Sequence, residues 1–302
     1  IKKISFHDFL GLIEECSRIV EEPLATTSMI PMYYLAQLAA EHVKVVLTGQ
    51  GADEPLGGYT RYRSEVLRAM VPAPLRSMAQ PVAKLLGSKN EQLRRGAKSI
   101  GIKDEISRFL SVYEVFTKKE IDQLIGVEDR MSPKVVSRFH QLLDCASRTH
   151  AAERMMALDT RMNLSDDLLN YTDKITMNFS LECRVPMLDL EFVHYMESLP
   201  LSAKLNGKQG KLIHKDYARQ LLPSTIINRR KKGFQSPTNT WFREEMETVR
   251  HILLAPSSAF SKRFNRRAVA EVLEQHAKGH NREKQIFLLL SIYYWFESNN
   301  LK

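Results

Sequence analysis

One short run of apolar residues constrains the fold of this chain more than any other feature. The run is VKVVLTG, residues 43–49, and it follows a helical pattern that starts near Pro31 and ends near His42. A strand that is apolar on both faces and is preceded by a helix is typical of a parallel sheet covered on both sides, so an α/β fold is predicted. One strand cannot form a sheet. Its partners either lie upstream of residue 1 or are not recognisable in the sequence.

Helical periodicity dominates the rest of the chain. Residues 71–103 contain three prolines and three glycines and are predicted to be rich in loops, with one short helix. Other helices are predicted over residues 1–22, 104–116, 117–125, 132–147, 149–162, 165–179, 189–198, 210–222 and, in pieces, 265–298. The sequence therefore predicts one continuous domain, 1–302, with an α/β part at 1–70 and a mainly helical remainder at 71–302.

The composition is that of an ordinary soluble globular protein. The 302 residues are 43% hydrophobic, which allows a sizeable core. Three scattered cysteines argue against a disulfide framework and favour a reducing, cytoplasmic location. We expect no membrane role, because no secretory signal is recognisable and the longest apolar run, Ile286–Phe296, is too short to cross a bilayer. The first residue is not Met, which suggests that an upstream part was removed or is not shown.

The net charge of +9 is concentrated in one segment. Residues 204–232 hold nine lysines and arginines and the single acid Asp216, so they contribute +8 of the +9. Such a concentration indicates a polyanion: a nucleic acid, a phospholipid or the phosphates of a nucleotide. The simpler interpretation is a solvated basic face. Nucleic acid is not expected, because the segment lacks interleaved aromatic residues and a groove-reading motif.

The loop after the strand, TGQGADEPLGGY at 48–59, contains four glycines and two adjacent acids. Ligands bind beyond the carboxyl ends of strands in open α/β sheets, and this loop is such an end. Gly49 and Gly51 would let a ligand approach the backbone, where consecutive N–H groups can bind an anion. Asp53 would repel a phosphate unless Mg²⁺ bridged the two. A plain glycine-rich turn, with Asp53 capping a helix that starts at Glu54, fits the spacing equally well.

Three further segments place charged residues where a site could form. Glu182 and Arg184 of LECRVP share one face if the segment is extended, either to orient a substrate or as a buried structural ion pair that joins helix to loop. Lys211 of GKQGK stands near a helix N-terminus, where a bound anion would offset its charge. Lys231 of RRKKGF lies beside Gly233, and a lysine in a closed pocket can stabilise a transferring phosphoryl or adenylate group. The pair His276 and His280 has helical spacing but no third metal ligand, and a solvated helix end is expected there.

Together these segments resemble the synthetase domain of the asparagine synthetase family, ATP pyrophosphatases of the PP-loop type. The resemblance covers residues 24–242 and rests on TGQGADEPLGGY, LSDDLLNYTDKITM, LECRVPMLD, GKQGK and RRKKGFQSP, in family order. It implies the parallel sheet of the adenine-nucleotide alpha-hydrolases, incomplete at its N-terminus, with a largely helical C-terminal part. It also implies an enzyme that adenylates the side-chain carboxylate of aspartate and transfers ammonia to it, releasing AMP and pyrophosphate. A homodimer is one assembly compatible with this class.

The resemblance assigns nucleotide-binding roles in the first loop and the basic segment. Thr48, Gly49 and Gly51 would contact ATP, and Asp53 would hold a Mg²⁺ ion that bridges the phosphates. Lys211 would bind the pyrophosphate that leaves.

The remaining roles belong to four charged residues. Lys231 would stabilise the adenylation transition state. Lys174 and Arg184 would help to position the phosphates and the substrate. Glu182 would be the acid of a catalytic dyad, as in the β-lactam synthetases, which share the pattern.

The sequence departs from the family in two respects. The SGGxDS loop and the N-terminal glutaminase domain, the expected source of ammonia, are absent, so the chain alone is not expected to form an adenylate. Gln50 stands where asparagine synthetases have an acid, and an amide cannot accept a proton at neutral pH. The base role is then lost or shifts to Glu182. The alternatives are a β-lactam synthetase-like or other biosynthetic enzyme acting on a different carboxylate, and a catalytically lapsed homologue that binds nucleotide.

Overall fold

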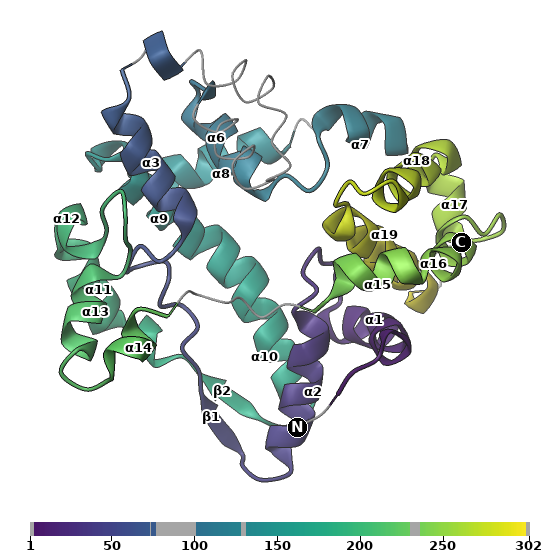
Figure 1. The fold of residues 1–302 in the computed structure, drawn as a ribbon, viewed down its shortest axis with the longest axis horizontal. Helices are drawn as coiled ribbons and strands as arrows, with labels where there is room; N and C mark the ends of the chain where they lie inside the picture. The colour runs from purple at the N-terminus through teal and green to yellow at the C-terminus, as the bar shows by residue number, and fades with distance from the viewer. Residues whose placement is uncertain (1–2, 73, 77–100, 128–130, 230–235, 300–302) are drawn as a thin grey trace.

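The computed structural model of the chain describes residues 3–72, 74–76, 101–127, 131–229 and 236–299, and it is mostly helical (Figure 1). The order of its main elements is α1 Phe6–Val20, α2 Met29–Ala40, β1 Val45–Leu47, α3 Thr60–Met70, α6 Glu105–Tyr113, α7 Lys118–Ile125, α8 Ser132–Leu142, α9 Ala151–Asp159, a π-helix Thr160–Leu169, α10 Asn170–Met177, β2 Glu182–Arg184, α11 Leu190–Ser198, α12 Leu201–Lys204, α13 Leu212–Ala218, α14 Ser224–Ile227, α15 Thr238–Glu244, α16 Met246–Leu253, α17 Ala259–Arg263, α18 Arg266–Ala277 and α19 Glu283–Ser298. None of the described helices is both long and apolar enough for a membrane span.

The predicted strand has its partner within the chain. β1 pairs in parallel with β2, and Val46 stands opposite Cys183. β2, Glu182–Arg184, lies in the LECRVP segment, where an extended conformation was one condition of the sequence prediction. Three residues are too few for a hydrophobic pattern to identify a strand. In the described part of the chain the two strands form the whole sheet, so the parallel α/β prediction holds for a small sheet inside a mostly helical structure.

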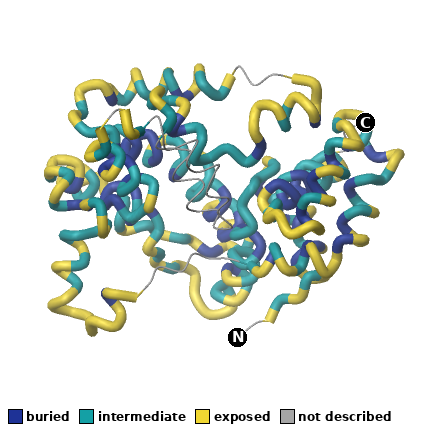
Figure 2. The backbone as a smooth tube through the Cα atoms, turned by 45° about the horizontal axis from the view of Figure 1, so that its top comes forward, coloured by how far each residue is buried: buried dark blue, intermediate teal, exposed yellow. Residues whose placement is uncertain are grey.

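Two apolar clusters make up most of the core (Figure 2). The larger one joins α1, α2, α10, α15, α16, α18 and α19, and it includes the fully buried Phe9, Phe242 and Phe287. The smaller one lies under α3, α6, α8 and α9 around Tyr62 and Phe109. Helices far apart in sequence therefore share the larger core. Three of the helices that contribute to it, α15 to α17, lie within residues 238–263, where the sequence predicted no helix.

A single helical run connects the two clusters. Residues 151–177 continue from α9 through the π-helix Thr160–Leu169 into α10, where the sequence predicted two helices with a break. A π-helix pairs each N–H with the carbonyl five residues back, and such stretches are rare and often found at functional sites. The run places Leu168 and Thr172 near the loop that follows β1, as the hydrogen bonds of Gln50 show.

His276 is buried, in contrast to the solvated helix end predicted from sequence. Its Nδ1 accepts a hydrogen bond from the backbone N–H of Arg282 at 3.0 Å, so the ring proton sits on Nε2 and is donated to the carbonyl of Asn239 at 3.2 Å. Both ring nitrogens are thus used in joining α18 to the start of α15 and of α19. Burial lowers the pKa of His276, because the charged ring would lose its hydration.

We predict that the protein loses stability in acid partly through His276. Its pKa in the folded state lies below the ordinary value of about 6.5, so the unfolded chain binds a proton first. The stability is present above about pH 6.5 and is lost as the pH falls from there through the folded-state pKa, by at most ~1.4 kcal/mol per pH unit. Urea unfolding at a series of pH values between 7.5 and 5 measures this loss of the free energy of unfolding.

The matched variants for this test are His276→Gln and His280→Gln. His280 is exposed, so its replacement should leave the pH dependence intact, whereas His276→Gln should flatten it at a lower overall stability. An unchanged pH dependence in His276→Gln would show that other groups cause the acid lability.

Candidate functional site

The loop after β1 is held by the segment that leads into α13. The backbone N–H of Lys211 donates to the carbonyl of Leu56 at 3.0 Å, and Lys211 Nζ lies 2.8 Å from Asp53 Oδ1. The N–H of Gly58 donates to the Asp53 carbonyl at 2.7 Å, which closes the loop on itself. The structure therefore brings together two of the predicted site residues, Asp53 and Lys211, as a largely buried ion pair.

Two glycines make this close approach possible. A Cβ on Gly58 would lie 1.9 Å from Asp53 Oδ1, and one on Gly210 would lie 2.1 Å from the Gly57 carbonyl oxygen. Gly51 has φ +77°, in the left-handed region that favours glycine. A Cβ on Gly49 would meet no atom within 4 Å. Most of the glycine surplus is thus used for packing within the chain, and Gly49 is the loop glycine with open space beside it.

Asp53 does not cap a helix, which corrects the plain-turn alternative. Residues 51–57 form turns, and the next helix, α3, begins at Thr60. The Asp53 carboxylate interacts with the ammonium of Lys211 instead. Lys211 itself adopts φ 57° and ψ 40°, a left-handed conformation that is rare outside glycine and costs roughly 1–3 kcal/mol. Such backbone strain persists only where surrounding contacts hold it, and it clusters at binding sites.

Gln50 acts as a hydrogen-bond donor between the loop and the long helical run. Its Nε2 donates to Thr172 Oγ1 at 2.9 Å and to the Leu168 carbonyl at 3.2 Å. Its Oε1 is buried without a hydrogen-bond partner in the structure. A glutamate could not make these two donations when ionised. The amide at this position is therefore explained by the local structure.

The two residues next to Gln50 sit at the carboxyl end of β1. The N–H of Thr48 donates to the Arg184 carbonyl at 2.9 Å and continues the β1–β2 pairing. The hydroxyl of Thr48 accepts from the N–H of Gln50 at 3.4 Å. Gly49 is exposed. Contacts of Thr48, Gly49 and Gly51 with ATP stay predictions.

Glu182 and Arg184 form an ion pair on β2, but the pair is exposed, which corrects the buried pair considered from sequence. Arg184 Nε lies 2.8 Å from Glu182 Oε1, and the side chains are 62% and 55% exposed. The strand places them on one face, as the extended reading predicted. The hydrogen bond from Arg184 lowers the pKa of Glu182 below its usual range. A carboxylate with a lowered pKa is a weak proton acceptor, so this geometry does not favour Glu182 as the base.

Lys174 is directed away from the loop. Its Nζ donates to the Val20 carbonyl and to Glu21 Oε2, both at 2.7 Å, which ties α10 to the end of α1. Two residues correspond to a turn of about 200° on a helix, so Lys174 lies on the side of α10 opposite Thr172, the partner of Gln50. The predicted role of Lys174 in phosphate binding stays a prediction. Lys231 lies outside the described residues.

A buried polar network beside the loop was missed from sequence. Asp159 is fully buried and accepts hydrogen bonds from Arg61 Nε and the Tyr62 hydroxyl, both at 2.6 Å, and from Tyr113. Burial raises the pKa of Asp159 despite these donors. The network fixes the start of α3 against the end of α9. The sequence feature that could have indicated this network is the alternation of aromatic and basic residues in YTRYR, residues 59–63.

Glu54 is the fully buried acid of the loop. It accepts a hydrogen bond from the Tyr59 hydroxyl at 2.8 Å, and burial raises its pKa. The two adjacent acids therefore differ: Asp53 faces a lysine, and Glu54 is held inside the fold by a tyrosine.

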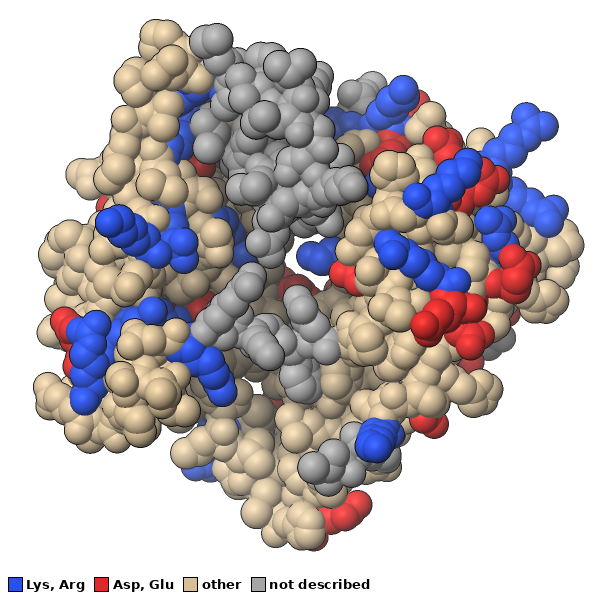
Figure 3. Space-filling view, viewed as in Figure 1, with Lys and Arg blue, Asp and Glu red and all other residues tan. Residues whose placement is uncertain are grey.

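The basic segment is not a uniformly solvated face. Lys204 is buried, Lys211 pairs with Asp53, and Arg219 pairs with Asp216. Figure 3 shows lysine and arginine side chains over the region of α13 and α14 with few acidic ones beside them. Residues 230–232 lie outside the described part.

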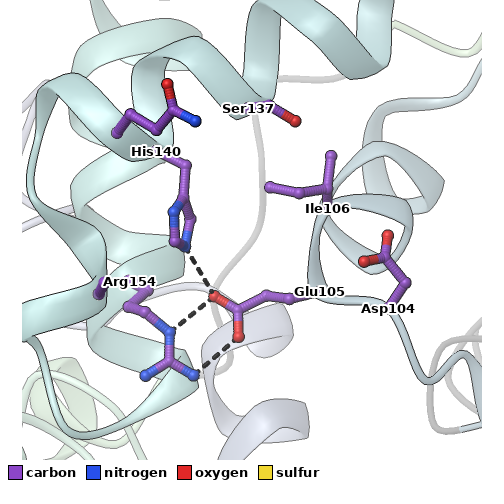
Figure 4. Close-up of a pocket in the computed structure, with 8 residues that line it drawn as sticks. Asp104, Glu105, Ile106, Ser137, His140 and Arg154 are labelled. Atoms are coloured by element: carbon purple, nitrogen blue, oxygen red, sulfur yellow. Dashed lines mark hydrogen bonds and ion pairs between the residues drawn. The ribbon is translucent and has the colours of Figure 1, made fainter.

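A cavity of about 420 Å³ lies elsewhere, between α6 and α8 (Figure 4). Its centre is Glu105, which receives two hydrogen bonds of 2.7 Å from Arg154 and stands 3.4 Å from His140 Nε2. None of the predicted site residues lines it. We therefore place the candidate site at the loop and not in this cavity.

In the loop after β1, Asp53 is the carboxylate that we consider as a ligand for a magnesium ion, because Glu54 is buried against Tyr59. No group of three or more histidines, cysteines and acids that suits a metal occurs among the described residues. Mg²⁺ is commonly bound through one or two carboxylates together with substrate phosphates and water. Asp53 fits such a site if phosphate oxygens complete it.

Comparisons with known proteins agree with the motifs. Residues 2–297 match the family model described as Asparagine synthase. The chain is 28% identical to Asparagine synthetase [glutamine-hydrolyzing] 1 of Bacillus subtilis, covering 99% of this chain and 47% of that protein. It is 28% identical to a putative asparagine synthetase of Mycobacterium tuberculosis (97% and 45%) and 25% identical to Amidase chry2 of Gibberella zeae (79% and 39%). The chain spans about half the length of the first two relatives.

We predict that Gln50→Glu destabilises the protein at neutral pH by about 1–3 kcal/mol, because the Leu168 carbonyl loses its donor and faces a carboxylate. The loss should shrink in acid, where a protonated glutamate can donate one hydrogen bond. Denaturant unfolding at pH 7 and pH 4 measures both effects. Gln220→Glu, at an exposed position, is the control and should change stability little. Equal stability of Gln50→Glu and wild type would contradict the donor role.

Proposed function

The chain belongs to the asparagine synthase family, and on that basis we propose that it is part of an ATP-dependent, amide-forming ligase. The family uses ATP. In this proposal the enzyme adenylates the side-chain carboxylate of aspartate or a related acid, transfers ammonia to it, and releases AMP and pyrophosphate. The observation that carries the proposal is the Asp53–Lys211 pair in the loop at the carboxyl end of β1.

The loop provides opposite charges that suit a nucleotide phosphate. Lys211 Nζ is a hydrogen-bond donor on a strained backbone, and it is paired with the Asp53 carboxylate. A Mg²⁺ ion held by Asp53 would neutralise phosphate charge. Lys211 would then donate to the pyrophosphate oxygens instead of to Asp53. Thr48 and Gly49 would bind the adenylate at the open side of the loop, whereas Gly51 is buried beside Leu188 and would act by shaping the turn. Lys231 would stabilise the charge that develops as the adenylate forms.

Two parts of the proposal concern the chemistry after adenylation: which group accepts the proton of ammonia, and which carboxylate is the substrate. Gln50 donates both amide hydrogens to the helical run and cannot take a proton from ammonia. Arg184, on the exposed face of β2, is suited to orient a carboxylate substrate. A carboxylate other than aspartate, as in a β-lactam synthetase-like enzyme, is the alternative, and an amidase stands among the relatives.

A second function, nucleotide binding without turnover, is favoured by the same amide. Gln50 is fixed by two hydrogen bonds, so no rotation frees it for catalysis without a loss of both. Calorimetry with Mg²⁺ and ATP distinguishes the two functions. Binding without pyrophosphate release supports the lapsed homologue, and turnover excludes it.

The full enzyme would contain more than this chain, since the chain spans about half the length of its bacterial relatives. A glutamine-hydrolysing domain would supply the ammonia, since the Bacillus subtilis relative is a glutamine-hydrolysing asparagine synthetase. Cytoplasmic location and a homodimer are proposed with it.

The main test is pyrophosphate release by the full-length protein. We expect release that depends on Mg²⁺, ATP and one carboxylate out of a panel that includes aspartate. A panel without release above background would refute the ligase.

Lys211→Met should lower the rate of pyrophosphate release by about 10²- to 10³-fold, the typical effect of removing one preorganised donor. Lys208→Met changes an exposed lysine in the same segment and should leave the rate within about twofold. A Lys211→Met enzyme with unchanged turnover would remove this residue from the mechanism. Lys231→Ala tests the adenylation role in the same assay.

A further inference from the structure

The cavity between α6 and α8 has no part in the proposed ligase chemistry. Its volume of about 420 Å³ lies within the range of small-molecule sites, roughly 300–1,000 Å³. Its walls are the start of α6, one face of α8, Ala146 in the short helix Cys145–Ser147, and Arg154 of α9 (Figure 4). Segments up to 50 residues apart in sequence thus converge on one hollow.

The face of α8 that lines the cavity is polar. Ser137, His140 and Gln141 are three and four residues apart, so they lie on one side of the helix. Another side of α8 carries Val136, which is 2% exposed and belongs to the smaller core. A hydroxyl, an imidazole and an amide are therefore grouped where a ligand could reach them.

The guanidinium in the cavity is already engaged. Arg154 donates through Nε and Nη2 to Glu105, both at 2.7 Å, and through Nη1 to the Arg148 carbonyl at 2.8 Å. Arg108 Nη2 lies 3.6 Å from the same Glu105 carboxylate. The charge of Glu105 is thus offset by arginines, and Arg154 has few N–H groups left for an anionic ligand.

Asp104 carries the remaining charge of the lining. Its Oδ2 caps α6 by accepting a hydrogen bond from the Ser107 N–H at 2.7 Å. Hydrogen bonds from Ser107 lower the pKa of Asp104, so the carboxylate is ionised at neutral pH. Among the residues that the structure describes, no basic side chain forms an ion pair with it. Figure 4 shows Asp104 across the cavity from His140 and Arg154.

We propose that this cavity binds a small organic ammonium ion, with its ammonium group at Asp104 and a hydroxyl or second amine at the polar face of α8. An ammonium group brings three donors and the positive charge that Asp104 lacks as a partner. Ile106, which lies between Asp104 and His140 in Figure 4, would contact the methylene groups of the ligand. A metal ion fits less well, because the described residues contain no group of three suitable ligands. The proposal is independent of the ligase chemistry.

The test is an NMR titration of the full-length protein, labelled at its histidine rings, with ethanolamine at constant pH and ionic strength. We expect a saturable shift of the His140 ring signals, whereas His194, exposed on α11, should not respond. Glycolate has a similar size, a hydroxyl and the opposite charge, and should cause no saturable shift. Putrescine in a parallel titration shows whether a diamine or an amino alcohol binds more tightly.

Asp104→Asn removes the charge and keeps the helix cap, since Asn caps helices about as well as Asp. It should raise the Kd for ethanolamine at least about threefold, because an exposed ion pair is lost. Asp122→Asn, at an exposed position on α7, is the matched control and should leave the Kd unchanged.

Three outcomes overturn the proposal. One is the absence of a saturable His140 shift with both amines. Another is a glycolate shift as large as that of ethanolamine, since charge would then not select the ligand. The third is a change smaller than about threefold in Asp104→Asn, because the ammonium would then not be bound at this carboxylate.

Discussion

The close approach of residues 205–211 to the loop after β1 is the constraint on which the candidate site depends. A side chain at Gly210 would prevent it sterically, because its Cβ would lie 2.1 Å from the backbone oxygen of Gly57, and one at Gly58 would displace the side chains of Asp53 and Lys211. The approach places Lys211 beside Asp53, so two segments about 150 residues apart in sequence form one charged centre. Neither segment alone explains the site. The loop supplies the acid and the open backbone, and the basic segment supplies the counter-charge.

The second support of the loop is the hydrogen bonding of Gln50. Its amide nitrogen donates to the Leu168 carbonyl and to the Thr172 hydroxyl, and these two bonds join the end of β1 to the helical run. The fully buried Asp159 fixes the other side of the loop region through Arg61 and Tyr62. The loop therefore lies between two polar anchors on the same long helical run.

The sequence predicted the parts of the molecule that depend on local patterns. The strand at β1, most helices and the loop with its acids follow from hydrophobic periodicity and glycine content, and the motif order identified the family. The contacts of Lys174 and His276 did not follow, because burial and partners come from segments far away in the chain. His276 shows the reason: its neighbours Asn239 and Arg282 give no sign in the sequence that they will bond both ring nitrogens. The second strand was not predicted either, because the three residues of β2 are too few to show the alternating pattern of a strand.

The long helical run from α9 to α10 has a geometric consequence for how the two cores are aligned. Its first part, at Met155 and Leu158, belongs to the smaller core, and its last part, at Tyr171 and Ile175, belongs to the larger one. Each residue of an α-helix rotates the side-chain direction by about 100° around the helix axis. The number of residues between the two cores therefore sets the angle between the helix faces that enter them. The wider turn of the π segment absorbs part of that angle. The number of residues in the run therefore fixes the orientation of one core relative to the other. Inserting or deleting one residue would rotate the cores against each other and misalign Leu168 and Thr172, the partners of Gln50.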